Sequence, residues 1–145
     1  MLFRSGKTDV IQMLNGCIGG LVAIIAEPLM PSPLAAILIG AVGGVIVVYG
    51  TKLLFSLKID DVVGAIPAHL FAGIWGTLAV PITNPDTNFG AQLLGVVSIN
   101  VFVFIVSLIV WAIMKNTIGI RLSKEGELKG TDVTETGVIA YAIRD

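Results

Sequence analysis

The chain has 145 residues, of which 55% are hydrophobic and 13% are charged, and its mean hydropathy is +0.94. A soluble domain carries about 25% charged residues to cover its surface, so this composition excludes an ordinary soluble protein and predicts a membrane protein. The net charge of -1 offers no overall basic surface, so we expect no nucleic-acid partner.

Four apolar segments predict the membrane-spanning helices. Each has roughly the 17 to 25 residues that a helix needs to cross a hydrocarbon core of about 30 Å. They lie near residues 9–27, 33–56, 62–82 and 90–117, and proline-rich, charged or turn-forming stretches separate them. Open strand edges are not tolerated in lipid, so the fold is expected to be an all-α, polytopic helical bundle. We therefore expect a transmembrane domain over residues 1–121 and a polar tail over residues 122–145.

The distribution of lysine and arginine predicts the orientation of these helices. Basic residues lie before the first segment, between the second and third, and after the fourth: Arg4, Lys7, Lys52, Lys58, Lys115, Arg121, Lys124, Lys129 and Arg144. The other two connections contain none. By the positive-inside rule, both termini of this chain are expected on the cytoplasmic side of a cell membrane that the chain crosses several times, with lipid around it.

Small residues mark one face of the third segment as a packing surface. They follow one another at four-residue spacing: Gly64, Ala68, Ala72 and Gly76. Gly73, which lies beside them, is expected to take part in the same helix packing. Residues at this spacing share one helix face, and small side chains there allow a neighbouring backbone to approach closely. The first two segments contain shorter versions of the same pattern: Gly16 with Gly20, and Gly40 with Gly44.

The only histidine of the chain, His69, lies beside this stripe near the middle of the third segment, one turn before Gly73. An ionisable side chain at this depth is costly to expose to lipid, so we expect it to face protein or a cavity. Two interpretations remain open: a functional imidazole, or a structural one that hydrogen-bonds a neighbouring helix. Pro67 cannot donate a backbone hydrogen bond, which frees the carbonyl of Val63 and predicts a kink.

Two aspartates, Asp60 and Asp61, precede the third segment and are expected to cap its amino-terminal end. Eight helical residues rise about 12 Å, so Asp61 and His69 cannot ligate the same ion, and we expect no metal site. The single cysteine, Cys17, also excludes a zinc site built from cysteines.

No nucleotide-binding loop and no nucleophile with a partnering histidine is present, so we expect neither an enzyme nor a cofactor. Four polar residues within or at the ends of the segments are expected to hydrogen-bond between helices: Asn15, Glu27, Asn100 and Ser107. A functional role stays open for Asn15 and Glu27.

The segments and their order resemble a known family. GKTDVIQMLNGCIGGLVAI, SPLAAILIGAVGGVIVVYG, KIDDVVGAIPAHLFAGIWGTLAV and residues 90–121 resemble helices eight to eleven of the ammonium transporter (Amt/Mep/Rh) family, its carboxy-terminal portion. The most specific part is one set of residues: Asp60, Asp61, Gly64, His69, Gly73, Trp75 and Gly76.

The resemblance implies a partial ammonium transporter fold and a role in nitrogen uptake. In the family, two histidines line a narrow hydrophobic channel for ammonium or ammonia, and His69 matches the second of them. The first histidine belongs to helices that this chain lacks, so the chain looks truncated and is expected to act within a longer protein that forms a homotrimer. The alternative is a non-transporting membrane interaction or assembly protein derived from an ammonium transporter.

The polar tail carries a further resemblance. GTDVTETGVIAY is similar to the tail signature of the family through six residues: Gly130, Asp132, Glu135, Gly137, Ala140 and Tyr141. This implies a regulatory tail that contacts a neighbouring subunit and a PII-type signalling protein at the cytoplasmic face. Thr131 and Thr136 depart from the signature, which has leucine and histidine at these positions.

Overall fold

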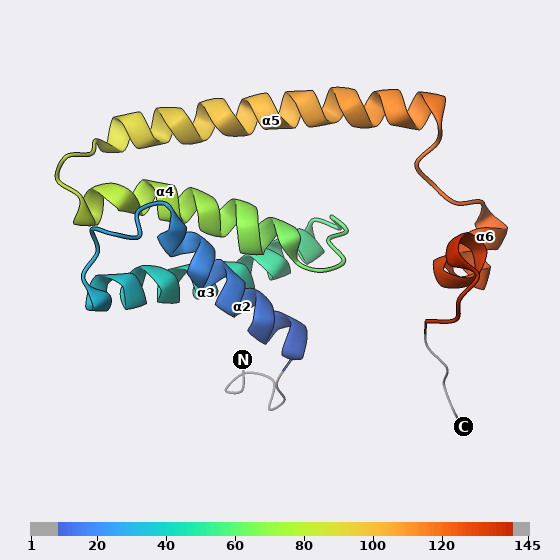
Figure 1. The fold of residues 1–145 in the computed structure, drawn as a ribbon, viewed down its shortest axis with the longest axis horizontal. Coiled ribbons are helices and arrows are strands. Elements are labelled where there is room, and N and C mark those ends of the chain that lie inside the picture. Colours follow the sequence, from blue (N-terminus) through green and yellow to red (C-terminus); the bar gives the residue numbers. More distant parts are fainter. Residues whose placement is uncertain (1–8, 141–145) are drawn as a thin grey trace. The chain divides into compact units, whose positions relative to one another are not determined.

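The computed structural model describes residues 9–140, and the helices in this range follow one another as shown in Figure 1. They are α2 (Val10–Ile25), α3 (Pro33–Ser56), η1 (Ile66–Phe71), α4 (Ala72–Thr83), α5 (Phe89–Thr117), α6 (Lys124–Lys129) and η2 (Asp132–Thr136). No strand occurs in the described range, so the predicted all-α class is confirmed. The chain divides into two compact units, Met1–Asn100 and Val101–Asp145.

Three stretches are long and apolar enough to cross a membrane: α3, η1 together with α4 (Ile66–Thr83), and α5. The sequence predicted four. The remaining helix, α2, is apolar but has only 16 residues, which corresponds to about 24 Å against a hydrocarbon core of about 30 Å. Length and composition therefore support three candidate spans, and a crossing by α2 stays a proposal.

Capping side chains set the helix ends that the sequence placed only approximately. The Ser32 hydroxyl accepts a hydrogen bond from the N–H of Ala35 at 3.3 Å, and Pro33 occupies the first turn of α3, where its missing N–H costs nothing. Before α5, Asn88 Oδ1 accepts hydrogen bonds from Gly90 N at 2.7 Å and Ala91 N at 3.3 Å. Each cap satisfies N–H groups that have no partner within the helix.

The third span begins later than the expected residue 62 and does not begin as an α-helix. Gly64 has φ +74°, a left-handed conformation that side chains with a Cβ rarely adopt, so regular helix cannot pass through it. The first turn after it, η1, is a π-helix that contains Pro67. A π-turn holds one more residue than an α-turn, and such turns often occur at functional sites.

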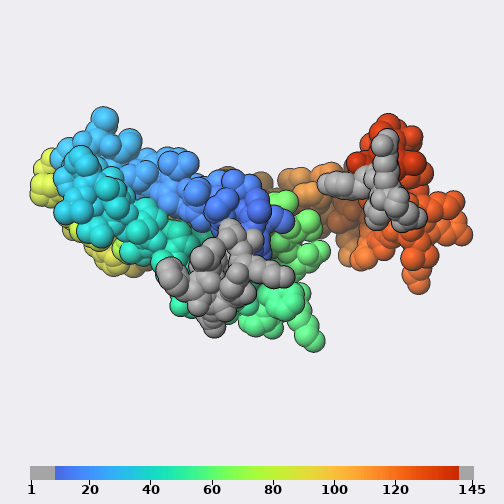
Figure 2. All heavy atoms as spheres, turned by 90° about the horizontal axis from the view of Figure 1, so that it is seen from below, coloured from blue at the N-terminus to red at the C-terminus, as the bar shows by residue number. Residues whose placement is uncertain are grey.

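Helices α2 and α3 lie side by side (Figure 2), and their backbones approach closely. A Cβ added to Gly40 would lie 3.3 Å from the carbonyl oxygen of Gly20, and one added to Gly20 would lie 3.2 Å from that of Gly40. A Cβ on Gly44 would lie 3.3 Å from the oxygen of Gly16. Both predicted glycine pairs therefore lie at this crossing, where van der Waals contact requires small residues.

The small-residue face of the third span lies against this pair of helices. Ala68 is 1% exposed and Ala72 is fully buried, and Gly64 and Gly76 are buried as well. The indole N–H of Trp75 donates a hydrogen bond to the carbonyl of Ile39 in α3 at 3.0 Å. Packing of small residues and one indole hydrogen bond thus hold α4 to its neighbours.

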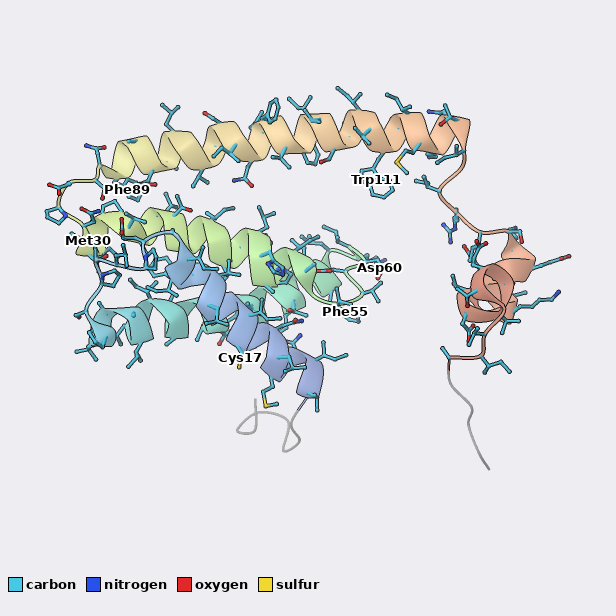
Figure 3. The ribbon with its side chains drawn as sticks, viewed as in Figure 1. Cys17, Met30, Phe55, Asp60, Phe89 and Trp111 are labelled. Carbon is cyan, nitrogen blue, oxygen red and sulfur yellow. The ribbon has the colours of Figure 1, made fainter. Side chains whose placement is uncertain are left out.

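None of the 29 residues of helix α5 is buried. Figure 3 shows its side chains projecting to opposite sides, with Phe89 at one end and Trp111 towards the other. A helix that is apolar on every side is typical of a segment surrounded by lipid or by other helices.

Candidate functional site

His69 lies in the π-helical turn η1, and its side chain is exposed. The neighbouring residue, Ala68, is buried against α2 and α3, as is Ala72 one turn later. Since successive helical residues point about 100° apart, the imidazole lies off the packing face. The structure thus separates a packing face and a histidine face on the same short helix.

The histidine face borders a cavity of about 330 Å³ within the first unit. Its lining comes from η1, α4 and the first turns of α5: His69, Leu70, Gly73, Ile74, Thr77, Gln92, Gly95, Val96, Ile99 and Asn100. Gly73 and Thr77 follow His69 at four-residue spacing and extend the same face. Gly73, expected from the sequence to be a packing residue, lines this cavity. An added Cβ at Gly73 would lie 3.7 Å from Val22 Cγ1, an ordinary van der Waals distance, so the contact with α2 is not tight here.

Two polar side chains that line the cavity donate hydrogen bonds to backbone carbonyls of their own helices. Thr77 Oγ1 donates to the carbonyl of Gly73 at 3.0 Å, and Asn100 Nδ2 donates to that of Val96 at 2.7 Å. Within residues 9–140 the imidazole of His69 has no hydrogen-bond partner. Its ring nitrogens can therefore donate to or accept from a small polar molecule in the cavity.

Of the two aspartates expected to cap the third span, only Asp61 does so in the described part of the chain. Its Oδ1 accepts a hydrogen bond from Ala65 N and its Oδ2 accepts one from Ile66 N, both at 2.9 Å. Asp60 is exposed and lies near Phe55 at the connection between α3 and η1 (Figure 3), where both line a separate cavity of about 130 Å³. One carboxylate with two acceptor oxygens is sufficient for the two free N–H groups.

Sequence reasoning did not assign the partner of one buried side chain, Asn15 in α2. It is 8% exposed, and its amide nitrogen donates to the carbonyl of Val63 at 2.7 Å. The missing N–H of Pro67 predicted that this carbonyl would be free. Nothing in the sequence indicated which side chain would fill the vacancy, because the two residues are far apart along the chain.

The tail residues singled out from the sequence define a local fold in the second unit. Gly130 and Gly137 have φ +97° and +68°, so both positions favour glycine. The Asp132 carboxylate accepts a hydrogen bond from Ala140 N at 2.8 Å, and this bond, with one from Val133 N, holds the pKa of Asp132 below its ordinary value. Glu135 is exposed, and Tyr141 lies outside the described residues.

An exposed ion pair precedes this turn. Arg121 Nε lies 2.6 Å from Glu127 Oε1, and the pair raises the pKa of Arg121 and lowers that of Glu127. An exposed pair of this kind contributes little to stability, so the tail conformation depends mainly on the glycines and on Asp132.

The apolar spans and their helical packing define the chain as a polytopic helical membrane protein. Residues 2–141 match the model of the Ammonium Transporter Family, and the chain belongs to this family. It is 38% identical to ammonium transporter Amt2 of Archaeoglobus fulgidus over 95% of its own length and 34% of that protein.

Two further relatives give the same result. The chain is 36% identical to ammonium transporter Amt1 of Haloferax mediterranei, over 94% of the chain and 27% of that protein. It is 31% identical to an ammonium transporter of Bacillus subtilis, over 93% of the chain and 37% of that protein. The family resemblance is thus confirmed, and the chain spans about a third of the length of the curated relatives it matches.

Proposed function

We propose that this chain forms the part of an ammonium transporter that corresponds to helices eight to eleven, with His69 on the path of ammonia through a histidine-lined hydrophobic pore. Family membership supports the substrate class. The observation that carries the proposal is the position of His69, which leaves the packing face and borders a cavity in an otherwise apolar span.

The chemistry of this face suits a neutral molecule that carries hydrogen-bonding groups. Ammonium is a cation, and moving it into apolar surroundings costs far more than moving ammonia. The cavity combines the imidazole of His69 with apolar side chains such as Leu70, Ile74 and Val96. A ring nitrogen can accept a proton or a hydrogen bond from the substrate, while the apolar lining disfavours the charged form.

The same proposal includes a topology and an assembly. The basic residues before, between and after the spans support cytoplasmic positions for both termini. We further propose that the complete protein is a homotrimer in a cell membrane, as the family resemblance implies. The exposed apolar side chains of α5 are available for contact with a neighbouring subunit. Lipid then covers the faces that no subunit contacts.

We propose a regulatory role for the tail, with Gly130, Asp132, Glu135 and Gly137 in the described part and Tyr141 beyond it. The ordered turn that Asp132 closes offers a defined polar surface at the cytoplasmic side. A neighbouring subunit or a PII-type signalling protein is the partner that this role requires. Deleting the tail is expected to change the regulation of uptake without abolishing conduction.

Uptake of labelled methylammonium tests the transport proposal. The matched third of Archaeoglobus fulgidus Amt2 is replaced by this chain, and the chimera is expressed in cells that lack ammonium transport. Removal of one strong hydrogen bond corresponds to about a tenfold loss, so His69→Ala is expected to lower uptake about tenfold or more while the chimera assembles normally. Thr51→Val, which removes a hydroxyl bonded within α3, serves as the control. A fall in uptake that is fully accounted for by a lower amount of assembled His69→Ala chimera would show that His69 is structural, and unchanged uptake would refute its place on the path.

The second candidate is a non-transporting membrane interaction or assembly protein. It is favoured by one observation: α2, α3 and α4 pack into a bundle within a chain that spans about a third of its relatives. In this case an assembled chimera conducts no methylammonium, and the chain instead co-purifies with full-length transporter subunits.

A further inference from the structure

We propose that Asn15 is a positioning residue that sets the orientation of His69 by holding the backbone of the π-helical turn. This inference rests on the proposed function, since it assigns Asn15 a part in presenting the imidazole to the substrate path. Asn15 lies in α2 and His69 in η1, so the effect has to pass through the backbone between Val63 and His69.

The first step is the hydrogen-bond balance of the Val63 carbonyl. Val63 precedes Gly64, whose φ of +74° interrupts the helix, so its carbonyl lies outside the turn that follows. The carbonyl of Gly64 itself accepts a hydrogen bond from Ala68 N at 3.2 Å. The Val63 carbonyl is bonded from another helix, by Asn15 Nδ2 at 2.7 Å. The side chain thus fixes the backbone immediately before the π-helical turn.

The second step is the space that the chain leaves for this amide. A Cβ at Gly64 would collide with Asn15 Nδ2, and the φ of +74° at Gly64 is itself unfavourable for a side chain. Asn15 is 8% exposed, and a buried amide without a hydrogen-bond partner costs free energy. The hydrogen bond from Asn15 to the carbonyl of Val63 is therefore strongly favoured. Gly64 is therefore matched to the position of Asn15.

The third step is the effect on His69. Asp61 holds the N–H groups of Ala65 and Ile66 through its two carboxylate oxygens, and Asn15 holds the carbonyl of Val63. The backbone at the start of the turn is thus held at its N–H groups by Asp61 and at a carbonyl by Asn15. If the bond from Asn15 is removed, the turn can relax between π- and α-geometry, and a shift of one residue in the helical register rotates the imidazole about the helix axis.

The single histidine of the chain permits a direct test by nuclear magnetic resonance. The purified chain, labelled in histidine and placed in lipid nanodiscs, gives one imidazole spin system, and no transport is needed for the measurement. Asn15→Leu keeps the number and branching of the side-chain heavy atoms and removes the donor. We expect it to shift or split the imidazole resonances of His69 and to speed hydrogen exchange of the backbone amides from Ala68 to Phe71 about 3- to 20-fold, the range for one hydrogen bond between membrane helices.

Asn116→Leu is the matched control, because Asn116 Nδ2 also donates to a backbone carbonyl, that of Ala112, at 2.7 Å. It is expected to leave the His69 resonances unchanged. The second variant is Asn15→Ala, which also removes the donor and cannot overpack the site. It is expected to change the His69 resonances and the exchange rates in the same way.

Two results would overturn the proposal. One is an Asn15→Leu chain that folds and gives the same His69 resonances and exchange rates as the original. The other is failure of both the Asn15→Leu and the Asn15→Ala chain to fold, which would show that Asn15 supports the fold as a whole and not the imidazole. A His69 signal that moves in the chain, while the assembled Amt2 chimera shows no uptake, would support the role of Asn15 and refute the transport proposal instead, so the two failures are distinguishable.

Discussion

Gly76 and Gly73 provide the sharpest test of the helix packing, because they lie on the same helix and differ in what an added methyl group meets. At Gly76 a Cβ would lie 2.9 Å from the Cα and the carbonyl carbon of Ala23 and closer still to its oxygen. At Gly73 the nearest atom would be Val22 Cγ1 at 3.7 Å, an ordinary van der Waals distance. Gly76→Ala should therefore push α2 and α4 apart, whereas Gly73→Ala should fit.

The magnitudes follow from these distances. Replacing glycine by alanine within a helix gains about 1 kcal/mol from backbone entropy, and this gain applies to both variants. Overpacking costs about 1 to 3 kcal/mol, and Gly76 belongs at the upper end because the atoms that it meets are backbone and cannot rotate away. We expect Gly76→Ala to lower the free energy of unfolding by about 2 kcal/mol, and Gly73→Ala to leave it unchanged or to raise it by up to about 1 kcal/mol.

Unfolding of the purified chain in mixed micelles with increasing denaturing detergent, followed by Trp fluorescence, measures this difference. Gly16→Ala is a further control, since an added Cβ at Gly16 has nothing within 4 Å. Equal stability of the Gly76→Ala and Gly73→Ala chains would refute the close approach of α2 and α4. The same outcome would also remove the argument that the small-residue face is the packing face.

Two further predictions concern single hydrogen bonds. Trp75→Phe removes the indole donor to Ile39 and part of a partly buried ring, so it should lower the free energy of unfolding by about 1 to 2 kcal/mol. The same detergent titration, followed here by circular dichroism, measures this change, and an unchanged midpoint would contradict the contact. In the tail, the hydrogen bond from the Ala140 N–H lowers the pKa of Asp132 in the folded chain. The hydrogen bond is therefore complete above the ordinary aspartate pKa of about 3.9, and it is lost as the pH falls through the lowered pKa of the folded chain. The amide proton shift of Ala140 should titrate only below about pH 4, and it should not titrate in Asp132→Asn.

The helices and their packing faces could be predicted because they depend on local features of the sequence. Apolar length gives the spans, and four-residue spacing of small side chains gives the face, so the burial of Ala68 and Ala72 agrees with the face that the spacing defines. The length of α2 was overestimated, because hydropathy does not show that its N-cap is Asp9 and that the helix ends at Ile25. Capping depends on individual hydrogen bonds, which composition does not reveal.

The detailed arrangement of the candidate site could not be predicted in the same way. Pro67 indicated a free carbonyl, but the donor, Asn15, lies in another helix, and only the three-dimensional structure brings the two together. The left-handed conformation of Gly64, which delays the start of the helix, could not be predicted either. The four-residue spacing of small residues already explained a glycine at this position. Both features depend on contacts between residues that are far apart in the sequence. A local pattern can therefore single out the residue, but it cannot predict what the residue contacts.

The third span has to pack tightly against α2 and α3 and also to leave the imidazole of His69 accessible, and two adjacent residues, Ala68 and His69, meet these two requirements. The face that begins with Gly64 and Ala68 must pack tightly, and an imidazole cannot lie there because backbones approach too closely. Moving one residue along the helix turns the side chain by about 100°, which is sufficient to bring His69 to the cavity while the backbone that carries it stays packed. A rigid, buried face thus supports an exposed imidazole without placing the ring in contact with the helices that hold it. For this reason a change on the packing face, such as Gly76→Ala, and a change of the imidazole itself should have separable effects on stability and on uptake.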